Sequence, residues 1–179
     1  PLVEQKESRA QSLATDLATA GFINEVMALA PKITDPDLRK FVYQAVLGQP
    51  AKVSEAQVTT IAQFQAANAK DLSDHDLFSR LTTDQGGYAK DLGSAKVNAA
   101  LKVVVKTYAT ASDLPQKLAQ LMFFHPGSRA AFTTWMLADK RSALLKQVSG
   151  QAYFVEGANI QAGGKTLHPD AATLGWAIG

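Results

Sequence analysis

The feature that most constrains the fold of this chain is a series of short amphipathic segments, many of them closed by glycine or proline. Apolar side chains recur three and four residues apart as far as residue 149, which is the spacing of one face of an α-helix. Four such stripes are Ala10, Leu13, Ala14 and Leu17; Leu38, Phe41, Val42 and Ala45; Val58, Ile61 and Ala62; and Val97, Leu101, Val104 and Tyr108. We therefore expect a mainly α fold, a single irregular bundle of about seven or eight short helices.

Several helix boundaries can be predicted from local signals. Asp35, directly before a proline, is typical of an N-cap, and Ser54 and Gln57 have the spacing of a capping box. Ser73 precedes acidic residues that the dipole of a following helix would favour, so we expect it to cap that helix. The glycine pair at 86–87 predicts a loop.

The last helical segment has an apolar stripe that changes direction. Phe132, Trp135 and Met136 lie on one side of a helix, whereas Leu144, Leu145 and Val148 fall mostly on the other. Either the helix breaks near Asp139 or one long helix is contacted on two faces. We favour the long helix.

The composition shifts at residue 150. Residues 150–179 contain 6 of the 12 glycines and an alternating pattern that predicts a small β-hairpin or an irregular arm. This arm is too short to hold a core of its own, so we expect one domain with a helical body at 1–149 and the arm at 150–179. Its apolar residues Leu174, Trp176 and Ile178 have to pack either on the helices of their own chain or on a neighbouring subunit, and we favour the neighbouring subunit.

A run of special residues separates two helices at positions 125–129. His125 precedes a proline, which disfavours helix continuation, and the following glycine and Ser128 can turn the chain and start the next helix. The main interpretation is a helix corner with aromatic residues packed around it. The alternative is an anion-binding site formed by His125, Ser128 and Arg129 at a helix N-terminus.

The charge distribution divides the chain into an acidic and a basic half. Residues 1–88 carry 8 Lys/Arg and 11 Asp/Glu, a net of −3, and residues 89–179 carry 10 and 5, a net of +5. Lys102, Lys106, Lys140 and Arg141 are the candidate binding residues for nucleic acid or another polyanion. The alternative is an ordinary solvated lysine face on amphipathic helices. The overall charge of +2 is too small to mark the whole chain as a nucleic-acid binder.

Catalytic and cofactor motifs are missing from the sequence. The chain has no cysteine, and its three histidines have no metal-ligand spacing. The cluster Asp74, His75 and Asp76 is best explained as the charged first turn of a helix. We therefore expect no cofactor and no metal, and we favour a protein without enzymatic activity over an enzyme.

Hydropathy gives no sign of a membrane segment. No run of about 18 apolar residues occurs, and the first residues are too polar for a signal peptide. We expect a soluble protein of the cytoplasm or of a virion.

Two classes of function remain. The first is a non-enzymatic assembly or interaction protein, such as a viral or phage coat, nucleocapsid or adaptor component, which associates with itself and presents its basic half to an anionic partner. The alternative is a small-molecule-binding module or hydrolase with its site at residues 125–129.

Overall fold

The computed structural model confirms a mainly helical chain. It describes residues 2–83, 85–151, 160–162 and 165–167. These residues form ten α-helices and three short 3-10 helices, more than the seven or eight helices expected from the sequence. No helix within the described ranges combines the length and the apolar character that crossing a bilayer requires.

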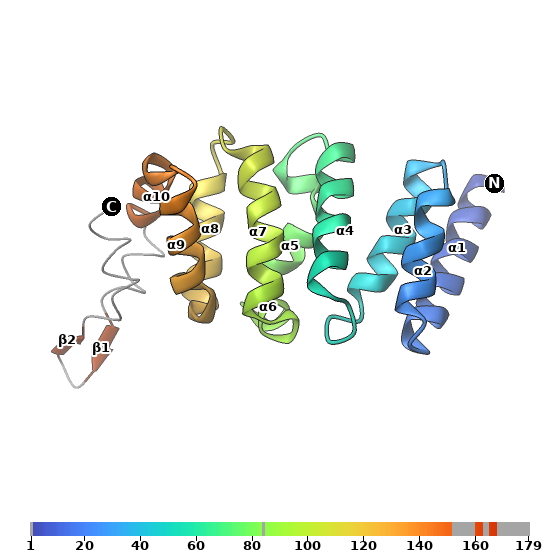
Figure 1. The fold of residues 1–179 in the computed structure, drawn as a ribbon, viewed down its shortest axis with the longest axis horizontal. Coiled ribbons are helices and arrows are strands. Elements are labelled where there is room, and N and C mark those ends of the chain that lie inside the picture. Colours follow the sequence, from blue (N-terminus) through green and yellow to red (C-terminus); the bar gives the residue numbers. More distant parts are fainter. Residues whose placement is uncertain (1, 84, 152–159, 163–164, 168–179) are drawn as a thin grey trace.

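The helices are arranged in a row that follows the order of the chain, with α1 at one end and α10 at the other (Figure 1). The α-helices are α1 Leu2–Thr19, α2 Ile23–Leu29, α3 Pro36–Leu47, α4 Glu55–Asn68, α5 Asp76–Thr83, α6 Gly87–Leu92, α7 Ser94–Tyr108, α8 Leu114–Phe124, α9 Arg129–Ala138 and α10 Ser142–Ser149. The 3-10 helices are Ala30–Lys32, Leu72–Asp74 and Pro126–Ser128. The main contacts run from α1 to α3, from α3 to α4, from α4 to α7 and from α8 and α9 to α10.

The core is continuous along this row, and its centre is the packing of α4 against α7. The predicted stripe of α4 is buried, and Val97, Leu101 and Val104 of α7 are fully buried as well. Tyr43, Phe78 and Phe132 are the largest fully buried side chains. Each such side chain contributes about 1.5–3 kcal/mol through removal from water.

Two of the three predicted helix starts are confirmed. A carboxylate oxygen of Asp35 accepts from the backbone N–H of Asp37, and Ser54 and Gln57 form a capping box. The prediction for Ser73 is wrong, because Asp71 caps the short 3-10 helix there and Ser73 donates to it. The helix α5 begins later, at Asp76.

The expected long helix after residue 129 is wrong, because the chain breaks between α9 and α10. Lys140 has a left-handed backbone with φ +57°, and the Arg141 N–H donates to the carbonyl of Met136. The break rotates the second apolar stripe toward the core, so that Phe132 and Met136 of α9 and the apolar residues of α10 are all buried. The predicted loop at 86–87 is also shorter than expected, because α6 begins at residue 87.

The arm at 150–179 lies mostly outside the described residues. Two three-residue strands, β1 Ile160–Ala162 and β2 Lys165–Leu167, pair antiparallel with Ile160 opposite Leu167. The proposed assembly residues Leu174, Trp176 and Ile178 lie outside the described ranges.

Gly86 is a position where the fold requires glycine. Its φ is +85°, and a Cβ there would lie 2.5 Å from the carbonyl oxygen of Phe124 in α8. Gly93 has a similar φ of +94°, yet no heavy atom lies within 4 Å of its Cβ position. Of these two glycines, only Gly86 is needed for the close approach of α6 to α8.

We expect Gly86→Ala to lower the free energy of unfolding by about 2–5 kcal/mol, the sum of left-handed strain and overpacking. The matched control is Gly21→Ala, because Gly21 has φ +97° and no heavy atom within 4 Å of its Cβ position. It has the strain without the clash and should lose about 1–2 kcal/mol. Urea denaturation measures both. Equal losses in the two variants would contradict the close contact with Phe124.

Candidate functional site

The three residues of the predicted anion site lie together at the corner between α8 and α9. His125 is the residue that ends α8, and its backbone N–H donates to the carbonyl of Leu121. Its ring Nε2 lies 3.5 Å from the hydroxyl oxygen of Ser94. Partial burial lowers the pKa of His125, so the ring is neutral at pH 7.

Ser128 and Arg129 point into the protein. Ser128 is fully buried and only 5% of Arg129 is exposed. The Arg129 Nε donates to the Met122 carbonyl at 2.9 Å, so this cation closes the last turn of α8, where helix carbonyls lack partners. Of the aromatic residues at the corner, Phe132 is buried, and Phe124 and Trp135 are half-buried. The geometry supports a structural corner, and anion binding there stays a prediction.

The four predicted polyanion-binding residues fall into two pairs on different elements. Lys140 and Arg141 lie in the turn between α9 and α10, where the Arg141 Nε pairs with the Asp139 carboxylate at 2.6 Å. The Arg141 guanidinium also lies over the Trp135 ring, 5.8 Å from its centroid. Arg141 is therefore engaged by residues of its own turn and of α9.

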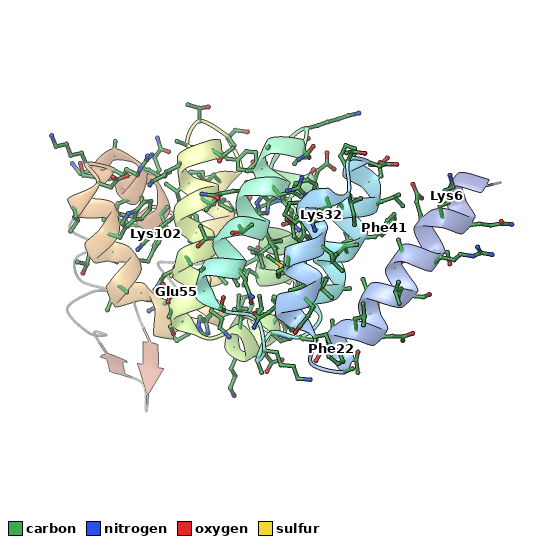
Figure 2. The ribbon with its side chains drawn as sticks, turned by 45° about the vertical axis from the view of Figure 1, so that its right-hand side comes forward. Lys6, Phe22, Lys32, Phe41, Glu55 and Lys102 are labelled. Carbon is green, nitrogen blue, oxygen red and sulfur yellow. The ribbon has the colours of Figure 1, made fainter. Side chains whose placement is uncertain are left out.

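Lys102 and Lys106 line a groove between α4 and α7, which we call the lysine groove. Its volume is about 370 Å³, and its polar lining consists of Glu55, Thr59, Gln63, Lys102, Lys106 and Thr107. Both lysine side chains are exposed and lie one helical turn apart, and Figure 2 labels Lys102 and Glu55 on the two helices. No ion pair among the described side chains engages either ammonium group.

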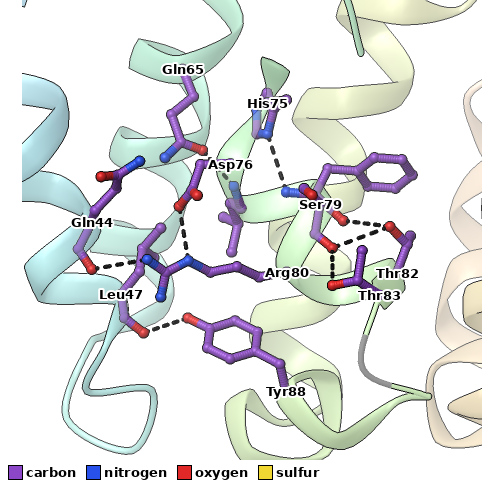
Figure 3. Close-up of polar contacts among 12 residues, drawn as sticks. Gln44, Leu47, Gln65, His75, Asp76, Ser79, Arg80, Thr82, Thr83 and Tyr88 are labelled. Carbon is purple, nitrogen blue, oxygen red and sulfur yellow. Dashed lines mark hydrogen bonds and ion pairs between the residues drawn. The ribbon is translucent and has the colours of Figure 1, made fainter. Parts of the chain in front are cut away.

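Of the cluster predicted as the first turn of a helix, Asp76 begins α5 and belongs to a polar network between α3, α5 and α6 (Figure 3). The Asp76 carboxylate accepts from the Arg80 Nε at 2.8 Å, and Arg80 also donates to the carbonyl of Gln44. The Tyr88 hydroxyl donates to the carbonyl of Leu47, and burial raises the pKa of Tyr88 to about 12. These contacts satisfy the carbonyls at the end of α3, which is a structural role.

His75 is fully buried and held as a neutral ring. Its Nε2 lies 3.0 Å from the Ala62 carbonyl, and its Nδ1 accepts from the Phe78 N–H. This pattern requires the proton on Nε2. Burial lowers the pKa of His75 because the charged ring would be desolvated.

A second groove, which the sequence had not identified as functional, lies at the α1 end of the row. We call it the front groove. It has a volume of about 150 Å³, and its lining includes Ala10, Leu13 and Leu17 of α1, Val26 and Leu29 of α2, and Ile33. The stripe of α1 was visible in the sequence, but the expectation was that a stripe of this kind faces the core.

The front groove is open because α1 packs mainly against α3 and makes only limited contact with α2. In Figure 2 α1 diverges from α2 between Phe22 and Lys6. Leu13 is 61% exposed, Leu29 51% and Phe22 48%. Three of the four large apolar side chains that are exposed among the described residues therefore belong to α1, α2 and their connection.

Comparison of the chain with protein-family models, curated proteins and solved structures finds no match. Within the part of the chain that the structure describes, no group of three or more metal-ligating side chains comes together. The function has to be inferred from the surface and the chemistry of the molecule itself.

Neutral His75 stabilises the fold above its unfolded pKa of about 6.5, and this contribution is lost as the pH falls toward the lowered pKa of the folded state. We expect the free energy of unfolding in urea to decrease from about pH 7.5 to about pH 5. His75→Gln, which keeps a donor and an acceptor but does not titrate, should show a smaller decrease. His125→Gln is the comparison for the second histidine, and an unchanged pH dependence in His75→Gln would contradict the assignment.

Proposed function

We propose that this chain is a non-enzymatic assembly or interaction protein that associates through its front groove. The observation that carries the proposal is the concentration of exposed apolar side chains at one end of the helix row. Contiguous apolar surface on a folded protein is typical of an interaction site, whereas single exposed apolar residues are ordinary.

The energetics favour coverage of the front groove. Leu13 and Leu29 border the same apolar cavity and are each about half exposed or more. Complete burial of a leucine side chain contributes about 1.5–3 kcal/mol. A partner that covers both leucines would therefore gain a substantial part of this free energy for each of them. Each tenfold gain in affinity requires about 1.4 kcal/mol.

We expect the protein to self-associate in a concentration-dependent manner, and Leu13→Asp to weaken this association at least about tenfold by placing a charge in the groove. Thr60→Asp is the control, because it adds the same charge at an exposed position of α4, in the middle of the row and away from the groove. Sedimentation equilibrium measures both. Monomers at all concentrations, or a loss of association only in the control, would contradict the proposal.

A second candidate function is polyanion binding in the lysine groove. It is favoured by the position of Lys102 and Lys106, which line one groove together with Thr59, Gln63 and Thr107. Lysines that neutralise phosphates release counterions, so such binding weakens steeply with salt. Glu55 in the same groove opposes this binding and would restrict where an anion sits.

Lys102→Glu with Lys106→Glu should abolish binding to a single-stranded oligonucleotide at low salt, and the wild-type affinity should fall linearly on a log–log plot against salt concentration. The double variant Lys90→Glu with Lys146→Glu has the same net charge but leaves the groove intact. Fluorescence anisotropy distinguishes the two. Equal loss in both variants would mean that net charge and not the groove controls binding.

A further inference from the structure

We infer that the front groove binds residues 168–179 of a second copy of this chain, with Trp176 as the side chain that enters the cavity. This inference rests on the proposed function and specifies its partner. The argument depends on the pattern of that segment, the size of the groove, the positions of the two ends and the charge of the two halves.

Residues 174–178 have the pattern of a segment that docks one face into an apolar groove. Leu174, Trp176 and Ile178 are spaced two apart, and an extended backbone would place all three on the same side. Small residues alternate with them, namely Gly175, Ala177 and Gly179. An extended segment of this kind would present one bulky apolar face and one face that other backbone can approach closely.

The front groove has room for one six-membered aromatic ring. A cavity of about 150 Å³ lined by aliphatic residues is large enough to hold a benzene ring, and the front groove has this volume and an aliphatic lining. The aromatic ring of Trp176 is the largest candidate in residues 168–179. Leu174 and Ile178 would then lie on either side of it, within reach of the exposed Leu13 and Leu29.

The positions of the two ends favour a neighbouring copy over the same chain. The front groove lies at the α1 end, and the helical body ends with α10 at the other (Figure 1). The path from α1 through α3, α4, α7 and α9 to α10 crosses five helix packings, or about 40–50 Å at 8–10 Å each.

The paired strands shorten the reach of the connecting segment. Because Ile160 pairs with Leu167, residues 160–167 fold back on themselves and add little length. The remaining residues 151–159 and 168–173 reach about 50 Å only at full extension. Binding to the same chain would require an almost straight linker, whereas a copy placed end to end can offer its groove without that constraint.

The charges of the two halves support this polarity. The half that contains the front groove has a net charge of −3, and the half that contains α8 to α10 has +5. A head-to-tail contact brings opposite charges together, whereas tail-to-tail contacts would bring two basic ends together. Such a heterologous contact leaves a groove free at one end and a segment free at the other, so it propagates into chains or closes into a ring.

The inference is tested by mixing two full-length variants, each deficient in one side of the contact. Trp176→Ser removes the anchor and keeps the groove, and Leu13→Asp alters the groove and keeps the segment. Sedimentation velocity is measured for the wild type, for each variant alone and for an equimolar mixture. We expect the wild type to form oligomers beyond dimers or a closed ring, each variant alone to be monomeric, and the mixture to form dimers that grow no further.

The other outcomes overturn the inference in distinguishable ways. If Trp176→Ser still oligomerises while Leu13→Asp does not, the groove is an interface but residues 168–179 do not occupy it, so the proposed function survives. If the mixture stays monomeric, complementary binding of segment and groove is excluded. If the wild type is monomeric at every concentration, both the inference and self-association fail.

Discussion

A row of helices can bury the apolar faces between its members, but it leaves an uncovered face at each end, and this constraint governs the whole structure. Repeat proteins that stack in one dimension usually solve the problem with a polar terminal unit. Here the first helix, α1, covers the apolar face of the row only in part. Ala14 and Ala18 of α1 are buried, whereas Leu13 on the same helix is 61% exposed. We propose that this uncovered face makes the α1 end an interaction surface.

The middle of the row provides the rigidity that such an end requires. The buried stripes of α4 and α7 are mainly aliphatic, and the neutral His75 joins α4 to the start of α5 through the Ala62 carbonyl. The contacts of Arg80 and Tyr88 with the carbonyls of Gln44 and Leu47 fasten α5 and α6 to the end of α3. A groove on rigid helices loses little entropy when a partner binds.

The sequence predicted the features that depend on neighbouring residues. The helical stripes and the caps at Asp35 and Ser54 agree with the structure, because their signals come from spacing and local hydrogen bonds. The break next to Asp139 was the less favoured of two predictions, since the choice depends on which neighbours the two apolar stripes meet. The role of Arg129 was not visible either, because its acceptor is the Met122 carbonyl of the preceding helix.

The candidate sites show the same division. The sequence identified Lys102 and Lys106 as a basic pair, but the groove beside them is formed by α4, which is distant along the chain. The stripe of α1 was predicted as well, but its exposure was not, because an amphipathic pattern does not show whether a partner is present. Exposure is a property of the whole row and needs the structure.

The most direct test of the account is backbone hydrogen exchange measured by mass spectrometry over a range of protein concentrations. If a second copy covers the front groove, protection of α1 and α2 rises with concentration, while protection of α4 and α7 stays constant. Protection of α1 and α2 that does not change with concentration would contradict the claim that this end of the row is an interface between copies.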